Sequence, residues 1–125
     1  MADWDDVRSI ALALPGAEET TSRGLMWWRA GPMFVAERPL RKKEVLELGP
    51  MDEPILVARL ESEDEKFALL AEDPDVFFTV SHYDGYAMVL VRLERISRER
   101  LAELIESAWA TAAPASEVTR HLGGG

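Results

Sequence analysis

The stretch "YAMVLVRL", residues 86–93, is the strongest strand signal in the chain and decides the fold class. It is an apolar run of strand length, and Gly85 immediately before it marks a turn. A second stretch, "PILVARL" at residues 54–60, has the same character. Because successive side chains of a strand point to opposite faces, each stretch contributes one set of residues to each side of a sheet.

The two sets predict different environments for the two faces. The first set has small and branched side chains suited to packing under helices: Leu56, Ala58, Leu60, Ala87, Val89, Val91 and Leu93. The second set is apolar with arginines at its end: Ile55, Val57, Arg59, Tyr86, Met88, Leu90 and Arg92. A sheet face in water normally alternates to polar residues. We therefore expect a loop, a ligand or another subunit to cover this second face.

Other segments complete the expected order of elements. Helices are predicted within residues 3–14, 62–72 and 97–113, with Asp3, Ser62 and Ser97 as N-caps. Residues 25–38 predict two strands joined at Gly31-Pro32, and residues 76–80 a short strand or irregular piece. The apolar faces expected for the second and third helices are formed by Phe67, Leu70 and Ala71, and by Leu101, Leu104, Ile105, Ala108, Trp109 and Ala112.

This order predicts an α+β fold, with a mainly antiparallel sheet and the N- and C-terminal helices packed on one face. The 125 residues suffice for one domain, which we assign to residues 1–116, with residues 117–125 as a frayed C-terminal tail. The chain has no cysteine, no apolar run of about 20 residues and an acidic N-terminus unlike a signal peptide. We expect a cytoplasmic protein with no membrane partner and no disulfide.

The charge of the chain bears on its partners. The net charge of −9 opposes contact with a long polyanion. The dense basic patch is Arg38, Arg41, Lys42 and Lys43, flanked by Glu37 and Glu44, and we interpret it as a solvated loop of mixed charge. The alternative interpretation of this patch is a nucleic-acid-binding surface.

Five pieces of sequence, in order, resemble the MmcQ/YjbR family of small bacterial proteins. They are "LALPGAEE", "FVAER", "KFALLAEDPDVFF", "HYDGYAMVLVRL" and "LAELIESAWATAAP", which together span roughly residues 7–114. The resemblance implies a fold related to that of CyaY, the bacterial frataxin. It also implies the family's label of DNA binding through a double-wing arrangement, which the acidic charge of this chain disfavours.

The loop "SHYDGY", residues 81–86, holds the most unusual group of polar and aromatic residues. The simpler interpretation is a tight turn at Asp84-Gly85, with both tyrosines on the apolar sheet face and His82 in a local hydrogen bond. The functional interpretation is a recognition loop at the mouth of that face, suited to a flat or anionic small molecule. Catalysis is disfavoured, because His82 lacks a second polar group with a clear role.

The tryptophans and the acidic clusters have structural interpretations. Trp4 and Trp109 lie on apolar helix stripes and are expected in the core, whereas the adjacent Trp27 and Trp28 must face opposite sides of the sheet. Trp27 and Arg29 fit the second face. Acidic first turns at residues 3–6 and 63–65 complement helix dipoles, so we predict no metal site.

Our leading interpretation is a non-enzymatic binding domain whose working surface is the second sheet face and the loop 81–86. No catalytic residue and no cofactor is expected, the partner is an unidentified small molecule or protein, and the chain is a monomer or a homodimer. The alternatives are DNA binding and a small-molecule enzyme that uses His82. The candidate ligand-binding residues are His82, Tyr83, Tyr86, Arg29, Arg59, Arg92 and Trp27.

Overall fold

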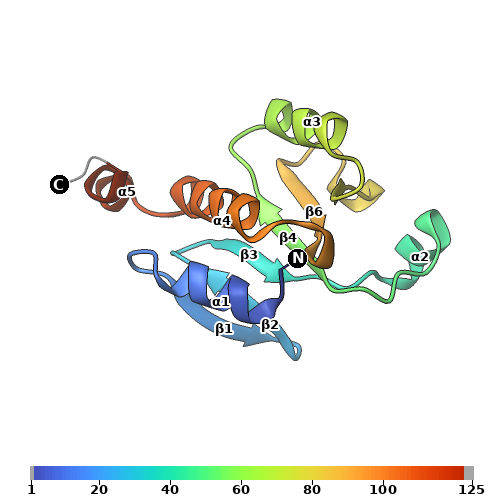
Figure 1. The fold of residues 1–125 in the computed structure, drawn as a ribbon, viewed down its shortest axis with the longest axis horizontal. Helices are drawn as coiled ribbons and strands as arrows, with labels where there is room; N and C mark the ends of the chain where they lie inside the picture. Colours follow the sequence, from blue (N-terminus) through green and yellow to red (C-terminus); the bar gives the residue numbers. More distant parts are fainter. Residues whose placement is uncertain (1, 123–125) are drawn as a thin grey trace.

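A six-stranded antiparallel sheet, in the order β1-β2-β3-β4-β6-β5, runs through the computed structural model, which describes residues 2–122. Helices and short 3₁₀ turns connect the strands (Figure 1), so the predicted α+β class is confirmed. The elements are α1 (Trp4–Leu12), β1 (Glu18–Ser22), β2 (Leu25–Arg29), β3 (Met33–Glu37), α2 (Lys42–Leu48), β4 (Ile55–Arg59), α3 (Glu63–Glu72), β5 (Phe77–Phe78), η1 (Ser81–Tyr83), β6 (Met88–Arg92), η2 (Leu93–Arg95), α4 (Arg98–Ala112) and α5 (Ala115–Leu122).

The first face of the sheet lies under α1 and α4, as Figure 1 shows. All seven residues of the first predicted set join this core, with Ala87 partly buried and the others buried. Trp109 of α4 is fully buried, and its indole N–H donates to the carbonyl oxygen of Pro15 at 2.8 Å. The predicted N-caps are also confirmed, because Asp3, Ser62 and Ser97 each accept a hydrogen bond from the backbone three residues ahead.

The second face carries a smaller apolar cluster, and segments of the same chain cover part of it. Its buried members are Ala36, Ile55, Val57, Val80 and Leu90. Leu40 and Met51, on either side of α2, pack against this cluster together with Phe78 and Tyr83. The cover is incomplete, since Trp27, Met33 and Met88 remain only partly buried.

Besides the short 3₁₀ turns η1 and η2, three elements were not predicted, and none of the three buries an apolar residue. Strand β1 is an edge strand of polar residues, held by its pairing with β2 and by Glu19, which accepts from the Trp28 indole at 2.9 Å and pairs with Arg8 at 2.8 Å. In α2 the buried residue is Glu44, and α5 buries no residue. Helix α5 includes residues assigned to the tail as far as Leu122; residues 123–125 lie outside the described chain.

The predicted apolar face of α3 is right at Leu70, which packs against the core, and wrong at its other two residues. Phe67 is 58% exposed and Ala71 is exposed, whereas Leu69 and Lys66 are the buried residues of this helix. The apolar spacing did not predict the buried face of α3, because Lys66 occupies an inward position, where its ammonium group donates to backbone carbonyl oxygens. Within residues 2–122 no helix combines the length and apolarity needed to cross a bilayer.

Candidate functional site

The loop 81–86 consists of a 3₁₀ turn followed by a tight reversal. Asp84 has φ −60° and ψ 128°, Gly85 has φ 82°, and the amide of Tyr86 donates to the carbonyl oxygen of Tyr83 at 3.0 Å. These values define a type II turn, in which the third position requires a positive φ and therefore favours glycine. The predicted turn at Asp84-Gly85 is confirmed, and strand β6 begins two residues after it, at Met88.

Lys66 of α3 supports this turn from beneath. Its side chain is only 2% exposed, and its ammonium group donates to the carbonyl oxygens of Tyr83 at 2.7 Å and Tyr86 at 3.1 Å. A buried ammonium group is tolerated only when such acceptors replace water. Lys66 therefore joins the two ends of the turn and fixes the loop against α3.

Arg38 supports the loop from the side of β3. Its guanidinium forms a bidentate ion pair with Glu44 at 2.9 and 2.6 Å, and its Nε donates to the Tyr83 hydroxyl at 3.0 Å. Burial alone would raise the pKa of Glu44, but hydrogen bonds from Arg38 and from the backbone amide of Arg41 outweigh it and lower that pKa. Both partners of the ion pair are buried, so Arg38 is committed to structure.

Glu47 of α2 supplies the third support. Its carboxylate accepts from the backbone amide of Ser81 at 3.0 Å and from the Ser81 hydroxyl at 2.8 Å. The loop is thus held by side chains from α3, from the end of β3 and from α2. A loop held on three sides presents its outward side chains in a fixed arrangement, which is what a preformed binding site requires.

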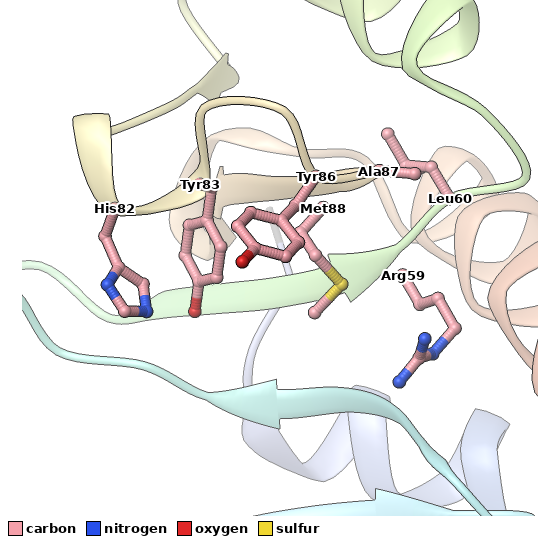
Figure 2. A pocket seen from close by; sticks show the side chains of 7 residues that line it. All are labelled: Arg59, Leu60, His82, Tyr83, Tyr86, Ala87 and Met88. Atoms are coloured by element: carbon pink, nitrogen blue, oxygen red, sulfur yellow. The ribbon is translucent and has the colours of Figure 1, made fainter.

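A pocket of about 490 Å³, which we call the loop pocket, lies between this loop and the ends of β4 and β6 (Figure 2). In Figure 2, His82, Tyr83, Tyr86 and Met88 stand in a row with their ends pointing the same way, and Arg59 lies at the far end from His82. The loop pocket is lined by Arg59, Leu60, His82, Tyr83, Tyr86, Ala87 and Met88.

Arg59 is the charged group of the loop pocket. It is partly buried, and its Nε donates to the carbonyl oxygen of Met33 at 2.8 Å, which leaves the two terminal nitrogens of the guanidinium for other acceptors. In the described part of the chain, no carboxylate lies within ion-pair distance of it. A positioned guanidinium of this kind suits a bidentate contact with a carboxylate or phosphate.

A second space of about 450 Å³, the sheet hollow, lies over the second face and shares Tyr83 and Met88 with the loop pocket. Its other apolar lining side chains come from β2, β3 and β4, and its charged lining residues come from the hairpin turn after β1, from the end of β3 and from the start of α2. They are Leu25, Trp27, Met33, Ala36 and Val57, with Arg23, Glu37, Arg38 and Arg41 as the charged residues.

The structure brings some of the predicted ligand-binding residues together and separates others. His82, Tyr83, Tyr86 and Arg59 line the loop pocket, and Trp27 lines the sheet hollow. Arg92 lies at the opposite end of the β4–β6 pair from Arg59, where it is close to Glu53 at 3.5 Å and over the ring of Phe78. Arg29 is exposed and lines neither space.

The predicted basic patch is divided by the structure. Arg41, Lys42 and Lys43 are exposed at the start of α2, and they line a hollow of about 470 Å³ together with Glu44 and Glu47. Arg38 is turned inward to its ion pair. The patch is therefore part loop, at Arg38 and Arg41, and part helix, at Lys42 and Lys43. Three of its four basic side chains remain available on the surface.

The surroundings of His82 bear on catalysis. The imidazole is exposed and lies edge-on to the Tyr83 ring at 5.0 Å between centroids. No hydrogen bond joins it to Asp84 or to any other residue within the range 2–122. Over the same range, no three histidine or carboxylate side chains converge as they would around a metal ion.

The residues that hold the loop 81–86 in place were not predicted from the sequence. Lys66 lies in α3, whose predicted inward face was apolar, and Glu44 and Glu47 lie in α2, which was not predicted. One signal was present for Glu44, because a glutamate three residues after Arg41 matches the spacing of a capping box. Nothing in the sequence indicates that Lys66 reaches a turn some twenty residues ahead.

Comparisons with known proteins identify the family. The YjbR family model matches residues 12–111. The chain is 43% identical to uncharacterized protein Rv2570 of Mycobacterium tuberculosis and to uncharacterized protein Mb2600 of Mycobacterium bovis, over 98% of this chain and 97% of each relative. A crystal structure of Deinococcus radiodurans protein DR2400, with the family-model domain DUF419, superposes with a TM-score of 0.69 at 21% identity, covering 98% of this chain and 89% of that one.

The chain therefore belongs to the YjbR family, and the resemblance drawn from the five sequence pieces is confirmed. The similarity to the Deinococcus radiodurans protein supports the fold alone at this level of identity.

Proposed function

We propose that this YjbR-family chain is a non-enzymatic binding protein that holds an anionic small molecule in the loop pocket. The observation that carries the proposal is Arg59, a partly buried guanidinium that is positioned by a backbone carbonyl and has no carboxylate partner in the described chain. Burying a charge without a partner is costly, so such a group is typical of a site whose partner is a ligand.

The rest of the loop pocket supports the same interpretation. His82 and Tyr86 are exposed side chains that add hydrogen-bonding groups, while Leu60, Ala87 and Met88 provide apolar contact. The volume falls in the usual range for small-molecule sites, about 300–1,000 Å³. Since His82 has no hydrogen-bonding partner in residues 2–122 to orient it, the arrangement supports binding more than acid–base catalysis.

Thermal melts with a panel of anionic metabolites test the proposal. We expect at least one carboxylate or phosphate compound to raise the melting temperature of the wild type. Arg59→Gln and His82→Ala should lose that increase. Arg29→Gln is the matched control, because it removes an arginine from the same sheet without altering the pocket. A panel that stabilises nothing, or an increase that Arg59→Gln retains, would contradict the proposal.

Nucleic-acid binding is the second candidate, and a specific observation favours it. Arg41, the N-cap residue of α2, and Lys42 and Lys43 in its first turn are exposed next to one another. Three basic side chains can neutralise only a few phosphates, and the net charge of −9 opposes the approach of a polyanion. Glu44 and Glu47 in the same hollow reduce the local positive charge further. We therefore rank this candidate below the small-molecule site.

A further inference from the structure

The loop pocket and the sheet hollow adjoin each other, and we treat the two spaces together as one groove. They share the side chains of Tyr83 and Met88, and their volumes of about 490 and 450 Å³ are similar. A molecule seated at Arg59 can therefore extend across these two side chains onto the second face of the sheet. The second face of the sheet, for which the sequence predicted a cover, therefore adjoins the candidate site.

The two parts differ in chemistry. The loop pocket contains the guanidinium of Arg59, which has two terminal nitrogens available for an anionic head. The floor of the sheet hollow is apolar and includes the half-buried indole of Trp27 beside Met33 and Val57. Arg59 stands next to the sheet hollow, because the carbonyl oxygen to which its Nε donates belongs to Met33.

The charge of the groove is opposite to that of the chain. The charged side chains that line its two parts are Arg23, Arg38, Arg41, Arg59 and Glu37, in a protein of net charge −9. Arg38 is matched by Glu44, and Glu37 accepts a hydrogen bond from the backbone amide of Met26 at 3.1 Å. A positive groove on an acidic surface attracts small anions while the overall charge repels large ones.

We infer that the ligand is an amphipathic anion, with a single carboxylate head at Arg59 and a flat apolar body over Trp27 and Met88. The inference rests on the proposed function and narrows its ligand class. A small anion with no apolar group would leave the apolar floor of the sheet hollow exposed to water. A neutral apolar molecule would leave the guanidinium of Arg59 without a partner. Half-buried rings at Trp27 and Tyr83 favour a flat body, since stacked aromatic contacts add to the burial of area.

Isothermal titration calorimetry tests the inference by comparing the affinity of one amphipathic acid with the affinities of its carboxylate fragment and its apolar fragment. The probes are indole-3-propionate, which has head and body, propionate, which has the head alone, and indole, which has the body alone. Naphthalene-2-carboxylate serves as a second flat amphipathic acid, and octanoate as an amphipathic acid without a flat body. We expect at least one of the two flat acids to bind at least about tenfold more tightly than propionate or indole, which corresponds to about 1.4 kcal/mol.

Variants test whether the carboxylate of the ligand binds in the loop pocket and its apolar body in the sheet hollow. Arg59→Gln should reduce the affinity of the best acid to about that of indole, and Trp27→Leu should reduce it to about that of propionate. Arg29→Gln, which lies outside both spaces, should leave the affinity unchanged. Melting curves of each variant without ligand establish that the fold is retained, and Trp27→Phe provides a milder change if Trp27→Leu does not fold.

Three results would overturn the inference. If propionate or inorganic phosphate binds as tightly as the amphipathic acids and Arg59→Gln abolishes it, the proposed function stands and the amphipathic ligand is wrong. If neither the acids nor the small anions bind, both fail. If sedimentation shows a wild-type dimer that Trp27→Leu dissociates, a second copy of the chain covers the sheet face instead.

Discussion

Replacing Lys66 with methionine should destabilise the protein by about 2–3 kcal/mol. The ammonium group is buried and donates to the carbonyl oxygens of Tyr83 and Tyr86. Hydrogen bonds to charged groups contribute about 1.5–3 kcal/mol each, so the two together amount to about 3–6 kcal/mol. Removing the ammonium also removes the cost of burying it, which offsets part of that loss. Methionine keeps most of the packing of the lysine stem.

Urea denaturation followed by circular dichroism measures this change, with Lys42→Met as the matched control. Lys42 is exposed in α2, and its replacement should alter the free energy of unfolding by no more than about 0.5 kcal/mol. Hydrogen exchange adds a local readout, because the amide of Tyr86 bonds across the turn and should exchange faster in Lys66→Met. If the two variants have equal stability and the Tyr86 amide is unaffected, Lys66 does not support the loop.

Three further predictions concern the ion pair, the core and nucleic acid. Glu44→Gln should destabilise the fold near neutral pH, because it removes the ion pair with Arg38. The pKa of Glu44 is lowered in the folded state, so the stabilisation by its carboxylate is present above the ordinary glutamate pKa of about 4.3 and is lost as pH falls through the folded-state value. A stability difference between wild type and variant that stays constant into acid would contradict the role of the ion pair. Trp109→Ala should cost about 3–5 kcal/mol in a denaturant melt, and an unchanged midpoint would mean that this side chain is not core. In a gel shift at physiological salt, DNA should bind weakly at most; submicromolar affinity that disappears when Arg41, Lys42 and Lys43 are all changed to alanine would reverse the order of the two candidate functions.

The sheet and the helices that cover it could be predicted because the spacing of apolar residues along a strand or helix follows from which of its side chains are buried. Residues 54–60 and 86–93 identified β4 and β6 and assigned their alternate side chains to the two faces. Helix α4 was equally clear, since its apolar stripe has the full helical spacing from Leu101 to Trp109. Strand β1 and helix α2 could not be found in this way, because hydrogen bonds and ion pairs hold them in place more than apolar packing does.

The candidate site was predictable in its residue types but not in its arrangement. The loop 81–86 stood out by composition, and its turn followed from Asp84-Gly85. Alternation alone placed Arg59 and Arg92 on one face without indicating that they lie at opposite ends of the paired strands. Strand register depends on how the connections fold, and here α3, β5 and the loop intervene between the two strands.

Titration of ¹⁵N-labelled protein, followed by amide chemical shifts, is the decisive experiment for the binding of a small anion in the loop pocket. The titrants are indole-3-propionate, inorganic phosphate and a mixed-sequence DNA duplex, each added to the same sample conditions. We expect saturable shifts from at least one of the two small anions, concentrated at residues 59–60 and 81–88, and little change with the duplex. Saturable shifts confined to residues 41–47 with the duplex, and none with either small anion, would contradict this expectation.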